Sequence, residues 1–216
     1  MENLKRAYLP PAGSDWALPL YDPITKLIGA DAAKMMLLDQ AALCSSHRVL
    51  DIGCGTGTLA LLVKRLYPDV EVVGLDPDPK ALARARKKAV RAGVAIQFDQ
   101  GFSDEMPYPE ASFDRVFSSF MFHHLHEEDR LKTLSNVRKV LVPGGSLHLL
   151  DMERPEAAAR GWWAGMLRSN PHLKDNSPGR VLELMGQAGF AGAKLVAEGK
   201  ILFGLMRSAY YQATAG

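Results

Sequence analysis

Three glycines at alternate positions, Gly53, Gly55 and Gly57, carry the strongest chemical signal in this sequence. They follow the aliphatic run 49–52, which predicts a buried strand, and they precede residues 58–63, which predict a helix. Glycine tolerates positive φ angles and has no Cβ, so its backbone can come close to a ligand. The first N–H groups of the helix would face that ligand as well. The pattern therefore predicts the front half of a nucleotide-binding βαβ unit.

Two common phosphate-binding turns are excluded by the residues that follow. The dinucleotide fingerprint G-x-G-x-x-G requires a glycine where this sequence has Thr58. A phosphate loop, G-x-x-x-x-G-K-[ST], requires a lysine, and none follows these glycines closely. The turn is therefore expected to bind a nucleoside-like ligand without the parts that hold phosphates.

The run from Val49 to Gly57 resembles motif I of the class I S-adenosylmethionine-dependent methyltransferases, hydrophobic-Leu-Asp-Ile-Gly-Cys-Gly-Thr-Gly. The resemblance implies that this turn wraps the methionine part of S-adenosylmethionine (SAM) and that the next strand ends on its ribose. It implies these cofactor-binding residues in the turn: Asp51, Gly53, Cys54, Gly55 and Gly57. The product would be S-adenosylhomocysteine (SAH).

Asp76 lies at the end of residues 70–76, the second predicted strand. Ligands of open α/β sheets bind at the carboxyl ends of the strands, and a carboxylate there can accept hydrogen bonds from both ribose hydroxyls. The alternative is that Asp76 caps the next helix. Asp78 is better placed for that role, with Pro79 at the first helical position. We therefore expect Asp76 to bind the ribose, with Pro77 beside the cofactor.

The next two strands are expected to complete the cofactor site. Residues 94–99 predict the third strand, and relatives often carry Gly-Asp-Ala just after Gln100, with the Asp holding the adenine. This sequence has Phe102 in place of that Asp, so we expect apolar packing from Phe102 and polar contacts from the Ser103 backbone or from Asp104. Ser119, near the end of the fourth predicted strand, belongs to the same expected set.

Tyr21 is the expected cofactor contact from the N-terminal part of the chain. Tyr21-Asp22 resembles the Tyr-Asp that many small-molecule methyltransferases carry before motif I, where the tyrosine often lies over the cofactor. The alternative is that Tyr21 packs a helix onto the domain, as aromatic side chains commonly do.

His123 and His124, which follow the fourth predicted strand, are the candidates for proton removal, because imidazole titrates near neutral pH. Together with His126 they also look like a metal cluster. Adjacent residues of an extended segment face opposite ways, and a fourth ligand with suitable spacing is missing, so no metal site is expected. A histidine pair at this place is common in the family without always being catalytic. The sequence favours a role in shaping the cleft over a direct role as the base.

The composition restricts the class of protein. The 216 residues suffice for one well-cored domain, and 47% hydrophobic and 23% charged residues are ordinary globular values. The net charge of +2 does not favour a nucleic-acid partner, and the basic residues between 84 and 91 are expected to form a solvated helix face. Two cysteines make no disulfide framework or zinc pattern.

The sequence also bears on the compartment. No apolar run approaches the ~20 residues of a membrane span. Residues 1–6 lack the apolar core of a signal peptide. We therefore expect a soluble, cytoplasmic protein without a transmembrane segment.

Alternating predicted strands and helices indicate an α/β fold with a parallel sheet. The resemblance implies a Rossmann-like class I methyltransferase sandwich: a seven-stranded, mostly parallel sheet in the order 3-2-1-4-5-7-6, with strand 7 antiparallel and helices on both faces. We expect a single domain, residues 1–216, as a monomer or homodimer. Its expected parts are an N-terminal helical cover (1–44), a SAM-binding core (45–151), an insertion that could cover the substrate (152–178), and a C-terminal helix and hairpin (179–216).

Three finer expectations concern element boundaries. Asp31 would cap a helix that runs to about Leu43. The fifth strand would span 146–151, after the break at Pro143-Gly144-Gly145. The terminal hairpin would turn near Gly199-Lys200.

Three functional classes stay open. The first is a methyltransferase for a small molecule, of the broad group that includes the ubiquinone and menaquinone biosynthesis C-methyltransferases. The single domain and its apolar covers favour it, with O-, N- or C-methylation undetermined. The second acts on a lipid headgroup or a macromolecule, but an exocyclic-amine enzyme would carry Asn/Asp-Pro-Pro-Tyr/Phe where this sequence has Ser118–Met121. The third is a non-catalytic SAM-binding module.

Overall fold

The computed structural model describes residues 29–153, 176–201 and 206–216. Most of the expected N-terminal cover (1–44) and of the insertion (152–178) therefore lies outside the described residues. Tyr21 lies outside them as well.

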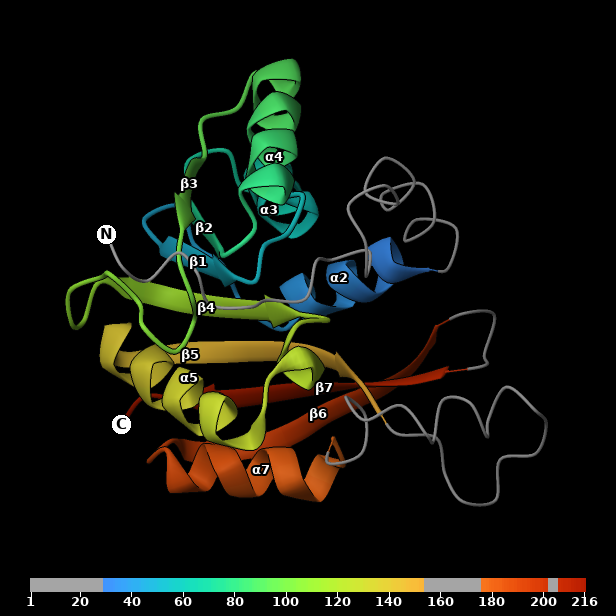
Figure 1. The fold of residues 1–216 in the computed structure, drawn as a ribbon, viewed down its shortest axis with the longest axis vertical. Coiled ribbons are helices and arrows are strands. Elements are labelled where there is room, and N and C mark those ends of the chain that lie inside the picture. The colour runs from blue at the N-terminus through green and yellow to red at the C-terminus, as the bar shows by residue number, and fades with distance from the viewer. Residues whose placement is uncertain (1–28, 154–175, 202–205) are drawn as a thin grey trace.

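Seven strands form one sheet in the order β3-β2-β1-β4-β5-β7-β6 (Figure 1). The strands are β1 (Arg48–Ile52), β2 (Glu71–Asp76), β3 (Gln97–Gln100), β4 (Phe113–Ser119), β5 (Leu141–Met152), β6 (Ala191–Ile201) and β7 (Met206–Thr214). The first five pair in parallel, whereas β7 runs antiparallel to both of its neighbours, β5 and β6. The expected strand order and the antiparallel strand are confirmed.

Helices cover both faces of this sheet. They are α2 (Ala30–Asp39), α3 (Thr58–Leu66), α4 (Pro79–Ala92), the 3₁₀ helix η3 (Phe122–His124), α5 (Glu127–Val140) and α7 (Pro178–Gln187). Successive residues of a strand point to opposite faces, and Val49 and Leu50 of β1 accordingly belong to different core clusters. The cluster with Val49 includes side chains of α2, α3 and α4, and the cluster with Leu50 includes side chains of α5 and α7.

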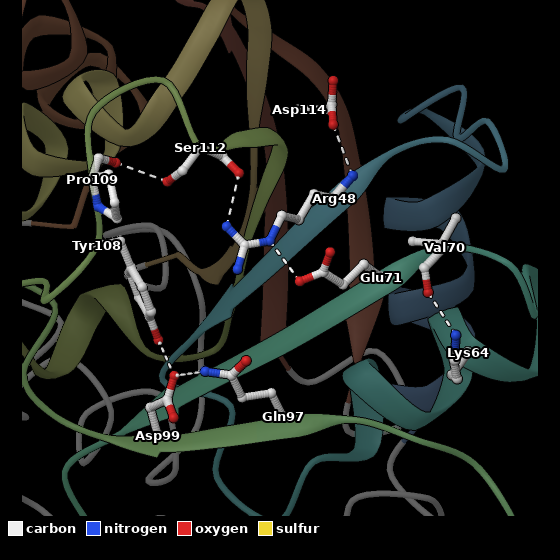
Figure 2. Close-up of polar contacts among 10 residues, drawn as sticks. All are labelled: Arg48, Lys64, Val70, Glu71, Gln97, Asp99, Tyr108, Pro109, Ser112 and Asp114. Atoms are coloured by element: carbon white, nitrogen blue, oxygen red, sulfur yellow. Dashed lines mark hydrogen bonds and ion pairs between the residues drawn. The ribbon is translucent and has the colours of Figure 1, made fainter.

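Arg48 fixes the amino end of β1 against its neighbouring strands (Figure 2). Its backbone N–H donates to Asp114 Oδ2 at 2.7 Å, and its Nε donates to Glu71 Oε1 at 2.6 Å. Its Nη1 also donates to the carbonyl of Ser112 at 3.3 Å. Asp114 therefore holds strand register at the sheet edge opposite the glycine-rich turn.

The caps of α4 were predicted correctly, but those of α2 were not. Asp78 is the N-cap of α4 and accepts a hydrogen bond from Lys80 N, and Gly93 follows the helix at φ +65°. Helix α2 is preceded by Gly29 at φ +83°, and Asp31 lies inside its first turn. A carboxylate in the first turn is favourable beside the positive end of the helix dipole without being a cap.

Two strands in the C-terminal half are longer than expected. Strand β5 begins at Leu141 because Gly144 N donates to Ala215 O and Gly145 O accepts from Ala215 N, so the Pro-Gly-Gly segment is paired, with a register shift against β4. Strand β6 continues through Gly199 and Lys200, which pair with β7. A Cβ on Gly199 would lie 2.9 Å from Ser208 Oγ, so this glycine serves close strand packing and not a turn.

Candidate active site

The glycine-rich turn lies between β1 and α3, at the carboxyl end of the strand. Gly53, Gly55 and Gly57 all have left-handed backbone angles, with φ of +65°, +53° and +73°. The N–H groups of Gly53 and Cys54 both donate to Leu75 O in β2, at 2.8 and 3.1 Å. The three positions that the sequence singled out are therefore those at which the backbone favours glycine.

Gly53 also makes room for the chain that follows β4. A Cβ on Gly53 would lie 2.3 Å from Cγ of Met121, so the Met121 side chain rests directly on the turn. Phe120, the residue before it, takes a left-handed φ of +55° where the chain leaves β4. The expected cofactor turn and the histidine segment are thus in contact.

Gly53→Ala is expected to destabilise the protein by about 1–3 kcal/mol, because the new methyl group overpacks against Met121 and the φ angle disfavours alanine. The measurement is urea unfolding. Adding Met121→Ala should remove the part of this loss of stability that comes from overpacking. The part that comes from the φ angle should stay. Strict additivity of the two substitutions would contradict the contact.

Asp76 holds the glycine-rich turn to the start of α4. Its Oδ2 accepts a hydrogen bond from Gly55 N at 2.8 Å, and its Oδ1 accepts one from Asp78 N at 2.9 Å. Burial raises the pKa of Asp76 to about 6, although these two N–H donors partly offset that rise. The sequence had suggested only a ribose contact, so this bracing role was missed. Each carboxylate oxygen can accept more than one hydrogen bond, so both roles are compatible.

Asp51 is the least satisfied carboxylate of the site. It is 1% exposed, and neither oxygen accepts a hydrogen bond of normal geometry from the described residues, although the backbone N–H of Ala60 lies close enough to lower the Asp51 pKa in part. Burial raises its pKa to about 7, and the positive charge of Lys34 on α2 lowers it in part. A buried carboxylate without hydrogen bonds of normal geometry is unfavourable in the free protein. It is suited to a ligand that brings a cationic or N–H donor.

Two other predicted cofactor residues lie close to the turn and β2. Cys54 is buried in the turn, where its Sγ would be 2.9 Å from a Cβ on Gly74, and burial raises the pKa of its thiol. Pro77 directly follows β2, and its carbonyl accepts a hydrogen bond from Gln100 Nε2 at 3.1 Å. Cys54 therefore has a packing role in the turn, whatever its part in binding.

The loop after β3 reaches the same end of the sheet as the glycine-rich turn, although the Ser103 side chain already has a hydrogen-bond partner. Gly101 N donates to Asp76 O at 3.2 Å, which places this loop at the end of β2. Phe102 is half-buried, but the Ser103 hydroxyl is hydrogen-bonded to Thr133 Oγ1 of α5 at 3.0 Å. Ser103 therefore braces the loop against α5. Its backbone stays the expected polar contact.

His123 forms a buried pair with Asp151 at the carboxyl ends of β4 and β5. Their Nδ1 and Oδ1 atoms are 2.5 Å apart, and the two side chains are 6% and 1% exposed. Asp151 also accepts hydrogen bonds from Met152 N (3.0 Å) and from Asn176 Nδ2 (3.1 Å). In the tautomer with the ring proton on Nδ1, His123 donates to this carboxylate, and Nε2 would then be the atom that can accept a proton.

The 3₁₀ helix that carries His123 is held from α5 by Arg130. The buried guanidinium donates to Leu125 O at 3.0 Å and to His123 O at 3.4 Å, and it lies over the Phe122 ring. The ring of His124 stacks on that of His123 with centroids 4.0 Å apart. The expectation that adjacent histidines face opposite ways is wrong here, because the segment is a 3₁₀ helix and not extended chain.

Ser119 ends β4 beside Leu150 of β5, one residue before the chain turns toward η3. The structure therefore brings the glycine-rich turn, Asp76 and the 101–103 loop to one edge of the sheet, and it adds the histidine segment through Met121.

Comparison with known proteins assigns the family. A family model described as a methyltransferase domain matches residues 49–145. The demethylmenaquinone methyltransferase of Thermus thermophilus is 36% identical over 146 residues, which make up 66% of this chain and 66% of that protein. The chain belongs to the methyltransferase family.

Two further proteins resemble this methyltransferase. The 27-O-demethylrifamycin SV methyltransferase of Amycolatopsis mediterranei is 38% identical over 152 residues, 69% of this chain and 51% of that one. A solved SAM-dependent methyltransferase from Aquifex aeolicus aligns with a TM-score of 0.66 at 19% identity, over 85% of this chain and 89% of that one. The structural match shows the class I methyltransferase fold. The chain spans about two thirds of the first relative and about half of the second.

The candidate site contains three residues that sequence reasoning missed: Asp151, Asn176 and Arg130. Asp151 gave a usable signal, because it lies near the end of the fifth strand just as Asp76 ends the second. The other two gave none, since their contacts depend on how α5 and the chain before α7 pack.

The two absences that follow concern residues 29–153, 176–201 and 206–216 of the chain. Its His, Cys, Asp and Glu side chains do not gather in groups of three that could hold a metal ion. None of its described helices is both long enough and apolar enough to cross a membrane.

Proposed function

We propose that this chain transfers a methyl group from SAM to a small-molecule acceptor, with His123 as proton acceptor and SAH as product. The observation that carries the proposal is the contact between Met121 and Gly53. Met121 precedes His123 of the buried His–Asp pair by two residues, so this contact supports a proton acceptor near the turn that would hold the methyl donor. An in-line transfer aligns the acceptor atom with the methyl carbon and the sulfonium sulfur, and a base must lie within reach of the proton on that acceptor atom.

The residues of the turn suit SAM on chemical grounds. Asp51 has two buried acceptor oxygens without hydrogen bonds of normal geometry from the described residues, and they would take the ammonium group of the methionine part. Asp76, at the end of β2, would accept from the ribose hydroxyls. The glycines allow the ligand to approach the backbone. When bound, SAM supplies an electrophilic methyl group on its sulfonium.

His123 and Asp151 would manage the proton of the acceptor. Nε2 of His123 takes the proton as the acceptor atom becomes nucleophilic, and the Asp151 carboxylate stabilises the imidazolium through Nδ1. Asn176 and Met152 donate hydrogen bonds to that carboxylate and hold it in this orientation. Such a device favours an acceptor that must lose a proton, as a hydroxyl group does. The rifamycin relative carries O-methylation in its name.

The binding test compares SAH with NAD and NADP in thermal unfolding. SAH at about 100 times its Kd adds about 2.7 kcal/mol to the free energy of unfolding. That corresponds to a rise in Tm of roughly 5–10 °C for a chain of this size. The dinucleotides should give none. The opposite ranking would replace this proposal with a dinucleotide enzyme. Labelled SAM and a panel of phenols, quinols, amines and lipids would then identify the acceptor.

Asp76→Ala is expected to weaken SAH binding by about tenfold or more in calorimetry, because a charge-assisted hydrogen-bond pair to the ribose is lost. The variant also leaves Gly55 N and Asp78 N without their acceptor, so a general loss of stability must be separated from a lost contact. Asp78→Ala is the control, since it removes the α4 cap but no proposed ligand contact. Asp76→Ala binding SAH as tightly as Asp78→Ala would contradict the ribose assignment.

A further inference from the structure

A groove of about 410 Å³ lies between helices α2, α3 and α4. These are the helices whose side chains share a core cluster with Val49 of β1. The apolar wall of the groove includes Met35, Leu61 and Leu62, and Met35 is 36% exposed there. Pockets for drug-sized ligands have volumes of about 300–1,000 Å³, so the groove can hold a small molecule. None of the residues proposed to hold SAM or the acceptor proton lines it.

The polar groups of this groove are mostly cationic. Among the residues that the structure describes, Arg65, Lys88 and Arg91 line it together with one carboxylate, Asp31. Two of these cations belong to the basic run 84–91, which the sequence suggested was a solvated face. The cations of that run do not all line the groove. Arg86 donates to Phe98 O and does not line it, whereas Lys88 lines it and is half-buried.

Lys88 also lies against the beginning of α3. Its Nζ donates to Thr58 Oγ1 at 2.9 Å and to Thr56 Oγ1 at 3.3 Å. Thr58 is the first residue of α3, where the helix dipole is positive, so the lysine charge and the dipole add. Positive potential of this kind attracts carboxylates and phosphates. Thr56 is 1% exposed and lies between Gly55 and Gly57, so Lys88 touches the cofactor turn as well.

We propose that this groove binds a monomeric anionic amphiphile and that its occupancy is linked to the glycine-rich turn. The apolar body packs on Met35, Leu61 and Leu62, while a carboxylate or phosphate head faces Lys88 and Arg91. An anionic head draws the ammonium away from the threonine hydroxyls that it braces. Occupancy therefore loosens the turn and weakens SAH binding, and by linkage SAH weakens amphiphile binding by the same factor.

Calorimetry on the full chain tests the ligand class with decanoate and decyl phosphate below their micelle concentrations. Both should bind, and added salt should weaken them. Decanol, inorganic phosphate and anionic vesicles should each bind at least about tenfold more weakly than decanoate, since each lacks the charge, the apolar body or the monomeric form. Equal binding of decanol, phosphate or vesicles would overturn the proposal in favour of a simple apolar groove, an anion site or a membrane surface.

Three variants locate the site. Arg91→Met should weaken decanoate binding about tenfold, the value of one charged contact. Met35→Asp, at an exposed position of the wall, should abolish it through repulsion. Lys87→Met is the matched control, because it removes the same charge from an exposed neighbouring position that does not line the groove. Equal losses in Arg91→Met and Lys87→Met would mean that only net charge matters and would overturn the assignment.

The linkage is measured by titrating SAH in the presence and absence of decanoate. An increase of about two- to tenfold in the Kd of SAH is expected, within the usual range of coupling between sites. Decanoate binding without any change in SAH affinity would overturn the linkage. A chain that binds decanoate but not SAH would refute the proposed function and leave the groove standing, so the two failures are distinguishable.

Discussion

Replacing His123 with asparagine is expected to lower kcat for methyl transfer by about 10²–10⁴-fold, the usual contribution of a positioned proton acceptor. The asparagine amide can still donate to Asp151, so the buried carboxylate keeps a partner. SAH affinity should change by less than about twofold, because only the transition state loses an interaction. The assay uses the acceptor found with labelled SAM, and calorimetry measures SAH.

His126→Asn is the matched control for this experiment. His126 is exposed three residues further along the chain, before α5, where asparagine is an acceptable N-cap. Its kcat should be unchanged. Asp151→Asn should reduce kcat to a similar degree as His123→Asn, since a neutral amide cannot stabilise the imidazolium as a carboxylate does. Undiminished kcat in His123→Asn would refute the proton-acceptor role.

Asp51→Asn is expected to stabilise the unliganded protein at pH 8 while weakening SAH binding by about tenfold or more. The pKa of Asp51 is raised to about 7 from an ordinary value of 3.8, mainly by burial. At pH 8 the folded protein therefore holds an ionised carboxylate that would be better solvated in the unfolded chain. About three pKa units correspond to up to about 4 kcal/mol.

The pH dependence has a defined sign. Between pH 3.8 and about 7 the folded state binds more protons at Asp51 than the unfolded state, so this group favours folding at low pH. That contribution is lost as the pH rises through about 7. The free energies of unfolding of the wild type and of Asp51→Asn, measured in urea, should therefore diverge between pH 5 and 8. The variant should be the more stable protein at pH 8. Asp69→Asn, an exposed carboxylate, is the control.

A variant less stable than the wild type at pH 8 would contradict this account, because it would mean that the Asp51 carboxylate is paired in the free protein. His148, which is fully buried in β5, contributes in the opposite direction. Burial lowers its pKa to about 3, so its contribution is present above pH 6.5 and is lost as the pH falls toward 3. The His148 contribution is the same in the wild type and in Asp51→Asn, so it cancels when their free energies of unfolding are subtracted.

Local sequence rules predicted the features that depend on neighbouring residues. The glycine-rich turn and the position of Asp76 follow from residue types within a few positions of each other. The caps of α4 do too, since Asp78-Pro79 and Gly93 are local signals. The sheet order was correct because the motif I resemblance supplied it, not because spacing required it.

The features that were missed depend on contacts between distant parts of the chain. His123 meets Asp151 only because β4 and β5 pair in a register that places their ends together. Strand β5 begins early because the Pro-Gly-Gly segment pairs with Ala215, at the other end of the domain. Asp76 has a second role because the turn of β1 folds back onto its carboxylate. Residue types alone do not specify these pairings.

The hydrogen bonds from Arg130 to the backbone of the 3₁₀ helix have a consequence for engineering. The proposed base, His123, is positioned by α5 and β5, through the backbone of the 3₁₀ helix on one side and Asp151 on the other. Neither support belongs to the glycine-rich turn. A designer could therefore exchange acceptor-facing side chains in a directed-evolution library while keeping Arg130, His123 and Asp151 fixed, and so change which molecule is methylated without rebuilding the proton relay.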